Sequence, residues 1–157
     1  MQKIEFNGRK LTIEDAQIGL RNFAGEKTNY NNEGNRNFVV FLDEEDANFL
    51  ADNNFNVKFP KERPDLDPEQ DNRKPFIKVT IGDYAKVIQV VERPDGEQNA
   101  LRLEGDEIGV LQRADIAKVD LVINPWLSKM NNKLSAYLDT GYFVRDIDQF
   151  GAKYGIY

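Results

Sequence analysis

Residues 118–144, KVDLVINPWLSKMNNKLSAYLDTGYFV, decide the fold class of this chain. Two apolar-rich runs, 118–129 and 133–144, flank the turn-forming pair Asn131-Asn132. Within each run, apolar side chains recur at every second residue, which is the period of a half-buried β-strand. The segment therefore predicts an antiparallel hairpin. Its expected core residues are Val119, Leu121 and Ile123 on the first strand and Leu134, Ala136 and Leu138 on the second.

Several other stretches predict strands by the same criteria. Residues 3–14 form two alternating runs around Asn7-Gly8, a pair typical of the two-residue type I′ hairpin turn. The second of these runs continues its apolar alternation as far as Leu20. Strands are also expected at 37–42, 75–81 and 85–91, and an extended segment at 55–59.

Few helices are expected, and all of them are short. Residues 43–54 offer Asp43 as an N-cap, acidic residues in the first turn and an apolar stripe. Residues 106–114 and 146–154 predict one or two helical turns each. Hairpin turns dominate and strands do not alternate with helices, which favours a small antiparallel barrel or sandwich. We expect a mostly β chain of six or seven strands and one or two short helices, folded as a single domain over residues 1–157.

The composition excludes several kinds of site. The chain has no Cys and no His, which excludes disulfides, thiolate or imidazole metal sites, and Ser–His–Asp or Cys–His catalysis. No signal peptide and no apolar run of transmembrane length is visible, so we expect a cytoplasmic protein without a membrane partner. The net charge of −6 argues against nucleic-acid binding by charge alone. The acidic residues are concentrated in 43–54 and 92–120, however, and the rest of the chain is neutral to basic.

Residues 60–75 contain four prolines and many charges, and they predict a solvated loop. The acidic residues between Asp65 and Asp71 invite comparison with a calcium loop. The EF-hand template fails, because Gln70 replaces its glycine and Phe76 its final glutamate. No glycine-rich phosphate loop is present. We therefore expect no metal and no cofactor, and an enzyme such as a metal-dependent nuclease is the least favoured function.

Aromatic and basic side chains are expected on the strand faces opposite the core. Strand alternation places Phe76 and Lys78 opposite one aliphatic row, and Trp126 and Tyr137 opposite two others. Bases stack on exposed rings for about 1–3 kcal/mol each, irrespective of sequence, and lysines neutralise phosphates. The alternative interpretation is that these rings fill the ends of the barrel or belong to the core in another register.

Residues 21–38, RNFAGEKTNYNNEGNRNF, form a slightly basic and amide-rich segment with three aromatic residues. The segment predicts a long loop between two strands, with Phe23 and Phe38 partly in the core. Its amides and cations suit the binding of bases and phosphates. Alternatively, its Asn and Gly residues serve only as turn formers.

Several short motifs, in this order, resemble one known family. They are RNFAG…YN..G.RNFVVFLD (21–43), NVKF.K.R (56–63), ADI..VDLVI.P (114–125), LSAYL (134–138) and A.KYG (152–155). The pattern is similar to that of small single-stranded DNA-binding proteins encoded by phages and prophages of Gram-positive bacteria. The resemblance extends from about residue 16 to residue 155. It implies an OB-like antiparallel barrel that coats single-stranded DNA during phage replication or recombination in the host cytoplasm, with phage replication or recombination proteins as further partners.

The resemblance also implies a set of DNA-contacting positions in this chain. Three departures weaken the expected affinity and partner recruitment: Asp139 stands where a basic residue is expected, the 62–73 loop is unusually acidic, and the chain ends in GIY rather than in an acidic tail. Together with Phe76 and Lys78, the candidate DNA-binding residues are Arg21, Asn22, Phe23, Lys27, Tyr30, Arg36, Asn37, Lys58, Lys61, Arg63, Trp126, Lys133 and Tyr137.

A second class of function is compatible with the same residues. The exposed aromatic side chains could form a protein interface in an interaction module or a virion-structural module built on a β-barrel. The two acidic segments would also suit a DNA mimic that binds a host DNA-binding protein. The oligomeric state, monomer or dimer, stays open at this point.

Overall fold

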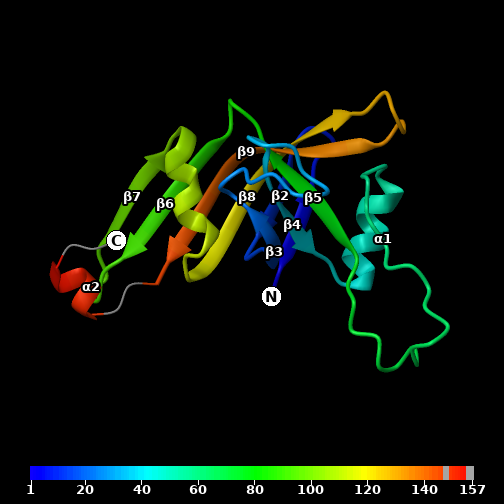
Figure 1. Cartoon of the computed structure of the whole chain (residues 1–157), viewed down its shortest axis with the longest axis horizontal. Coiled ribbons are helices and arrows are strands. Elements are labelled where there is room, and N and C mark those ends of the chain that lie inside the picture. Colours follow the sequence, from blue (N-terminus) through cyan, green and yellow to red (C-terminus); the bar gives the residue numbers. More distant parts are fainter. Residues whose placement is uncertain (147–148, 155–157) are drawn as a thin grey trace.

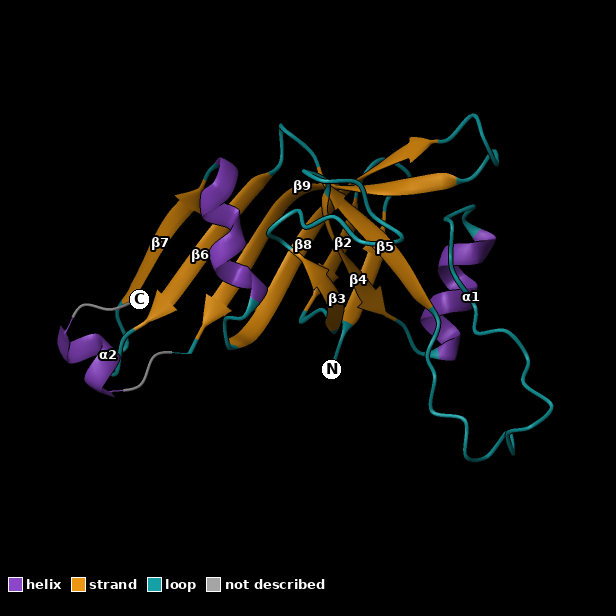
Figure 2. Cartoon of the chain, viewed as in Figure 1, coloured by secondary structure: helices purple, strands orange, loops and turns teal. Residues whose placement is uncertain are grey.

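The structure, a computed structural model, describes residues 1–146 and 149–154. The mostly β class with short helices is confirmed (Figure 1 and Figure 2). The strands are β1 (Lys3–Phe6), β2 (Leu11–Glu14), β3 (Ile18–Asn22), β4 (Arg36–Phe41), β5 (Phe76–Ile81), β6 (Lys86–Glu92), β7 (Gln98–Leu103), β8 (Ile116–Leu127) and β9 (Leu134–Arg145). The helices are α1 (Glu44–Asp52), the 3-10 helix η1 (Gly105–Gln112) and α2 (Gln149–Tyr154).

Strand β9 lies at the centre of the sheet. One of its edges pairs with β8 in the antiparallel hairpin predicted from the sequence. Its other edge is divided between two parallel partners: Ala136 and Tyr137 pair with β5, and residues 140–145 pair with β6. The two halves of β9 therefore belong to different parts of the molecule. The first half completes a barrel-like sheet, and the second carries the β6–β7 hairpin away from it (Figure 1).

The barrel-like part depends on a bend between β2 and β3. The strand order β1-β2-β8-β9-β5-β4-β3 is a path and not a closed ring. Only residues 15–17 separate β2 from β3, and they bond to strands on both sides. Ala16 N donates to Val119 O on β8 at 2.7 Å, and Phe41 N on β4 donates to Gln17 O at 2.8 Å. One bent segment thus joins β8 to β4, which is compatible with the partly open Greek-key barrel of the OB fold.

Three phenylalanine rings form the centre of the core. Phe23, Phe38 and Phe143 are fully buried, with ring centroids 5.4 to 6.0 Å apart. Phe38 comes from β4 and Phe143 from β9, so their packing joins two strands that are not hydrogen-bonded to each other. The predicted inward residues of the β8–β9 hairpin and of β5 are buried around them, apart from the half-buried Leu134.

Helix α1 begins where the sequence predicted. Asp43 accepts a hydrogen bond from Asp46 N at 2.8 Å, as an N-cap should. Ala47 and Leu50 of the expected apolar stripe are fully buried. The short helix expected at 106–114 corresponds to η1.

The expected six or seven strands are too few, because the described residues form nine. Two local predictions are also wrong. Phe6 pairs with Leu11, so the first hairpin has a four-residue loop and not a two-residue type I′ turn. The Asn7 side chain stabilises this longer loop by accepting hydrogen bonds from the backbone N–H groups of Arg9 and Lys10. Strand β7 was not predicted, because its first five residues are exposed on both faces and show no apolar alternation.

An ion pair joins the residue before β2 to the middle of β9 across β8. Asp139 lies at a register shift between β8 and β9, where its carboxylate meets the Lys10 ammonium group at 2.7 Å. Lys10 also bonds to Asn124. The hydrogen bond from Lys10 holds the pKa of Asp139 below its ordinary value of 3.8. The negative charge of Asp139, the acidic residue that departs from the family pattern, is therefore balanced by the positive charge of Lys10.

Substitution of Gly141 by Ala should destabilise the protein. A Cβ at this position of β9 would lie 2.6 Å from Cε2 of Phe143, whose ring is locked in the core. Overpacking of this kind costs about 1–3 kcal/mol of unfolding free energy. Gly82→Ala is the matched control, because a Cβ there meets no atom within 4 Å. Urea unfolding of both variants tests the expectation, which fails if they are equally stable.

Removal of the Lys10–Asp139 pair should have an effect that depends on pH. The folded pKa of Asp139 is lowered, so its stabilisation is complete above the unfolded value of 3.8 and is lost as the pH falls through the lower folded pKa. We expect a double-mutant cycle of Lys10→Met and Asp139→Asn to give a coupling of about 0.5–1 kcal/mol at pH 7. The coupling should shrink in acid. A coupling that is independent of pH would contradict the pairing.

Candidate nucleic-acid interface

The strand register places a set of polar and aromatic side chains on the outer face of β4, β5, β9 and β8. Thr80 of β5 lies between Asn37 of β4 and Tyr137 of β9. Tyr137 in turn lies beside Asn124 of β8. These side chains alternate along their strands with buried residues such as Val79. We call this surface the outer sheet face.

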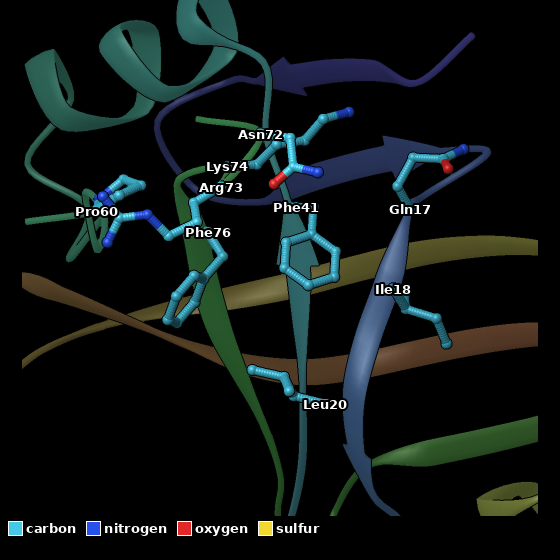
Figure 3. Close-up of a pocket in the computed structure, with 9 residues that line it drawn as sticks. All are labelled: Gln17, Ile18, Leu20, Phe41, Pro60, Asn72, Arg73, Lys74 and Phe76. Atoms are coloured by element: carbon cyan, nitrogen blue, oxygen red, sulfur yellow. The ribbon is translucent and has the colours of Figure 1, made fainter. Parts of the chain in front are cut away.

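One end of the outer sheet face is an apolar pocket of about 650 Å³. Phe41 and Phe76 come from neighbouring strands and lie edge to face, with ring centroids 6.3 Å apart. Ile18 and the exposed Leu20 complete the apolar lining, as Figure 3 shows. Gly19 leaves room for this arrangement, because a Cβ there would lie 2.3 Å from Cε2 of Phe41.

The other end of the outer sheet face is an aromatic pocket of about 390 Å³. Trp126 and Tyr137 line it from the β8–β9 hairpin, and Tyr84 from the turn that follows β5. Trp126 is 68% exposed, and Tyr84 is almost fully exposed. The rings are therefore accessible to a flat ligand from solvent.

Strand β5 connects the two pockets. Phe76 lines the apolar pocket, and Gly82, just beyond the end of the strand, lines the aromatic one. Between them, the exposed Lys78 and the half-buried Thr80 point to the same face. A ligand that enters both pockets therefore passes over a lysine.

The cations near this face differ in how free they are to bind phosphate. In the part of the chain that the structure describes, several exposed lysines make no ion pair, whereas Arg36, Arg63 and Arg73 each bind a carboxylate. Arg73 and Lys74 lie at the edge of the apolar pocket. Among the described residues, the exposed lysines without an ion pair are Lys27, Lys58, Lys61, Lys74, Lys78, Lys86, Lys129, Lys133 and Lys153.

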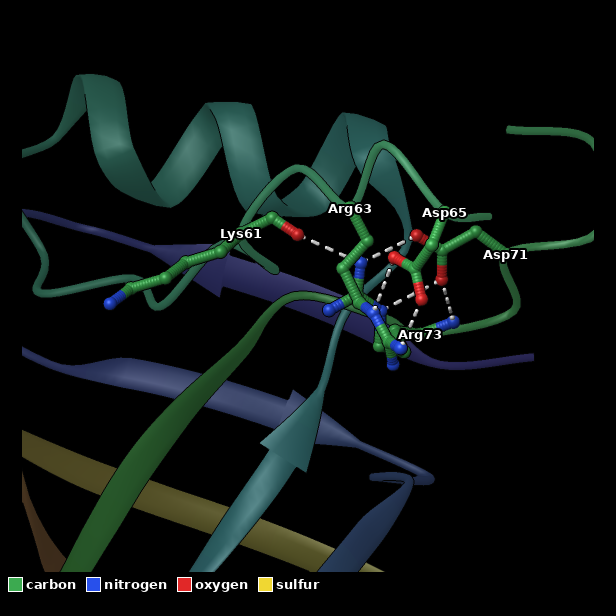
Figure 4. A network of polar contacts seen from close by, with 5 residues as sticks. All are labelled: Lys61, Arg63, Asp65, Asp71 and Arg73. Carbon is green, nitrogen blue, oxygen red and sulfur yellow. Dashed lines mark hydrogen bonds and ion pairs between the residues drawn. The ribbon is translucent and has the colours of Figure 1, made fainter. Parts of the chain in front are cut away.

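The loop at 60–75 neutralises its own arginines (Figure 4). Arg63 binds Asp65 and Arg73 binds Asp71, each through an Nη2–Oδ2 contact of 2.7 Å. Arg73 also donates to the carbonyl oxygen of Lys61 at 2.8 Å. The hydrogen bond from Arg73 lowers the pKa of Asp71 to about 2, so this carboxylate stays charged at neutral pH. The loop therefore attracts phosphates less than its arginines suggest.

Besides Arg63, five of the candidate residues have structural partners that occupy them. Phe23 is in the core, and Arg21 donates to the carbonyl oxygens of Leu111 and Ala114. Because of these contacts, neither side chain is available to DNA in this conformation. The side chains of the other three also have partners: Asn22 makes two hydrogen bonds with the Glu26 backbone, Arg36 pairs with Asp106 at 2.9 Å, and Asn37 donates to Asn31 at 3.0 Å.

The loop between β3 and β4 presents the remaining candidates of this segment. Gly34 N donates to Gly25 O at 2.8 Å, and the Asn31 amide donates to three backbone carbonyls of the loop. This bonding leaves Lys27 exposed and Tyr30 96% exposed. The asparagines thus build the loop, and the tyrosine and lysine are the side chains it offers to a ligand.

The sequence analysis missed three residues of the outer sheet face. Phe41 falls within the strand predicted at 37–42, and Leu20 ends the alternating run that follows Asn7-Gly8, so neither residue is predicted to face a ligand. Leu20 is exposed because its backbone turns into the left-handed region, with φ of 45°. Tyr84 offered a usable signal, since an aromatic residue in the polar turn after a strand has no core to enter.

Other classes of site are not found in the described residues. Residues 1–146 and 149–154 contain no cluster of three or more acidic side chains placed to hold a metal ion. Within the same residues, no helix has the length and apolar character needed to cross a membrane.

Comparisons with known proteins identify the family. Two solved structures are similar in shape, both of the single-stranded DNA-binding protein from bacteriophage Enc34. The C-terminally truncated form has 12% identity and a TM-score of 0.49, covering 90% of this chain and 89% of that one. The form in complex with single-stranded DNA has 14% identity and a TM-score of 0.48, covering 92% and 91%. No curated protein matches. The family model described as a putative phage single-stranded DNA-binding domain matches residues 1–156, and the chain therefore belongs to that family.

Proposed function

We propose that this protein binds single-stranded DNA on the outer sheet face and coats it, without sequence preference, during phage replication or recombination. The carrying observation is the arrangement of two ring-lined pockets on one sheet face with Lys78 between them. The family match over nearly the whole chain supports the same function. We further propose that residues 1–157 act as one binding domain in the host cytoplasm, without catalysis and without a cofactor.

The chemistry of the face favours single strands over duplexes. The exposed rings of Trp126, Tyr84 and Tyr137 offer stacking surfaces to bases, which a duplex keeps inside its own stack. Stacking contributes about 1–3 kcal/mol per base and depends little on base identity. A protein with a net charge of −6 would gain little from the phosphates of a duplex alone. Because most of the binding energy comes from stacking on unpaired bases, we expect the protein to bind single strands more tightly than duplexes.

The first prediction concerns binding and its fluorescence signal. Trp126 is the one tryptophan of the chain, so its emission reports on the aromatic pocket directly. We expect a labelled oligo(dT) of about 30 nucleotides, longer than one OB-fold footprint, to raise anisotropy and quench this emission. A duplex of the same length should do neither at the same concentration. Absence of binding to oligo(dT) at low salt would refute the function and favour a protein interface on this face.

The second prediction separates the face from the rest of the surface. Lys78→Gln should weaken oligo(dT) binding and reduce the salt slope by about 0.7, the contribution of one phosphate contact on a single strand. Lys3→Gln is the matched control, because this exposed lysine lies on β1 and pairs with Glu5 at 3.4 Å. Equal slopes for both variants and the wild type, measured between low salt and 0.3 M NaCl, would remove Lys78 from the interface.

A further inference from the structure

The end of the β8–β9 hairpin exposes apolar side chains where turns are usually polar. Met130, in the connection between the strands, is 96% exposed, and Leu127 at the end of β8 is also exposed. Trp126 precedes them on the same hairpin. Figure 1 shows this hairpin end projecting beyond the sheet, next to α1. Trp126, the residue before Leu127, also lines the aromatic pocket.

Hydrogen bonds hold the tip in one conformation. Ser128 N donates to Lys133 O, and Asn132 N donates to Ser128 O, each at 2.9 Å. The Ser128 hydroxyl accepts from Met130 N at 3.3 Å. Asn54, just after α1, ties the tip to the rest of the fold: its side chain donates to Asn132 O at 3.0 Å, and its carbonyl accepts from Leu134 N at 2.7 Å. The backbone of the tip is therefore held in one conformation, which limits the entropy lost to ordering the Met130 side chain when it meets a partner.

The charges around the tip indicate what that partner is. Lys129 and Lys133 flank Met130 and Asn131, are exposed, and make no ion pair in the described part of the chain. No acidic residue occurs between residues 121 and 138. An apolar apex between two free cations suits a base-pair surface bordered by phosphates. A protein partner with an acidic rim is the competing occupant, but only DNA would join this tip to the neighbouring stacking site.

We propose that the tip, residues 127–134, is a wedge for the junction between single-stranded and duplex DNA. Met130 packs against the last base pair, Lys129 and Lys133 contact the phosphates of the two strands, and the released strand runs toward Trp126. Apolar side chains such as Met and Leu unstack base steps in this way, at a cost of a few kcal/mol per step. The inference rests on the proposed single-strand binding and adds recognition of the point where a duplex opens.

The test compares a forked DNA with its single-stranded arm alone. We expect the wild type to bind the fork about threefold to tenfold more tightly than the arm, because burial of one apolar side chain supplies about tenfold or more and the opening of the base step offsets part of this gain. A 2-aminopurine in the terminal base pair should brighten on binding. Met130→Ser should abolish both the preference and the signal while binding oligo(dT) within about twofold of the wild type. Met130→Leu should retain both.

Leu101→Ser is the control for loss of an exposed apolar side chain elsewhere, since Leu101 lies on β7 and is also exposed. It should keep the fork preference. The wedge is refuted if the wild type binds oligo(dT) but does not prefer the fork, or if Met130→Ser keeps the preference. If the wild type does not bind oligo(dT), the proposed function is refuted, and the wedge with it. Equal melting temperatures for all variants confirm that the differences do not come from unfolding.

Discussion

The rest of the structure depends on the pairing of β9 with three strands at once. Its long antiparallel contact with β8 fixes the register of both strands, and its other edge accepts β5 and β6 in succession. Side chains on the two faces of β9 therefore have opposite environments. Phe143 enters the centre of the core, and Tyr137 points outward beside Thr80. Gly141 is small because the ring of Phe143 occupies the space that a side chain would need.

The ion pairs of the fold explain how an acidic protein can present the proposed surface for DNA. Some acidic residues form ion pairs with cations of the same chain. Asp139 pairs with Lys10, and Asp106 pairs with Arg36. The outer sheet face combines rings with a lysine that has no such partner among the described residues, Lys78. Binding energy can then come mainly from stacking, with a modest contribution from phosphates.

Local sequence patterns were enough to place some residues of the predicted interface but not others. Alternation along one strand was enough to place Lys78, Trp126 and Tyr137 outward, because the two faces of a strand differ by a single residue step. The same reasoning could not place Arg21 or Arg36. Their partners lie about 70 to 90 residues away in the sequence, on η1 and the segment after it. Contacts of that span depend on the packing of η1 against the barrel, which no local pattern encodes.

By itself, the sequence determined the mostly β class, the central hairpin, the capped helix α1 and the faces of the principal strands. Each of these follows from short-range physics: side-chain alternation, turn chemistry and N-capping act within a few residues. Only the tertiary structure decided that β5 and β6 both pair in parallel with β9 and that Phe41 meets Phe76 on the outer sheet face. It also decided which cations are free, because an ion pair needs two residues that distant parts of the chain bring together.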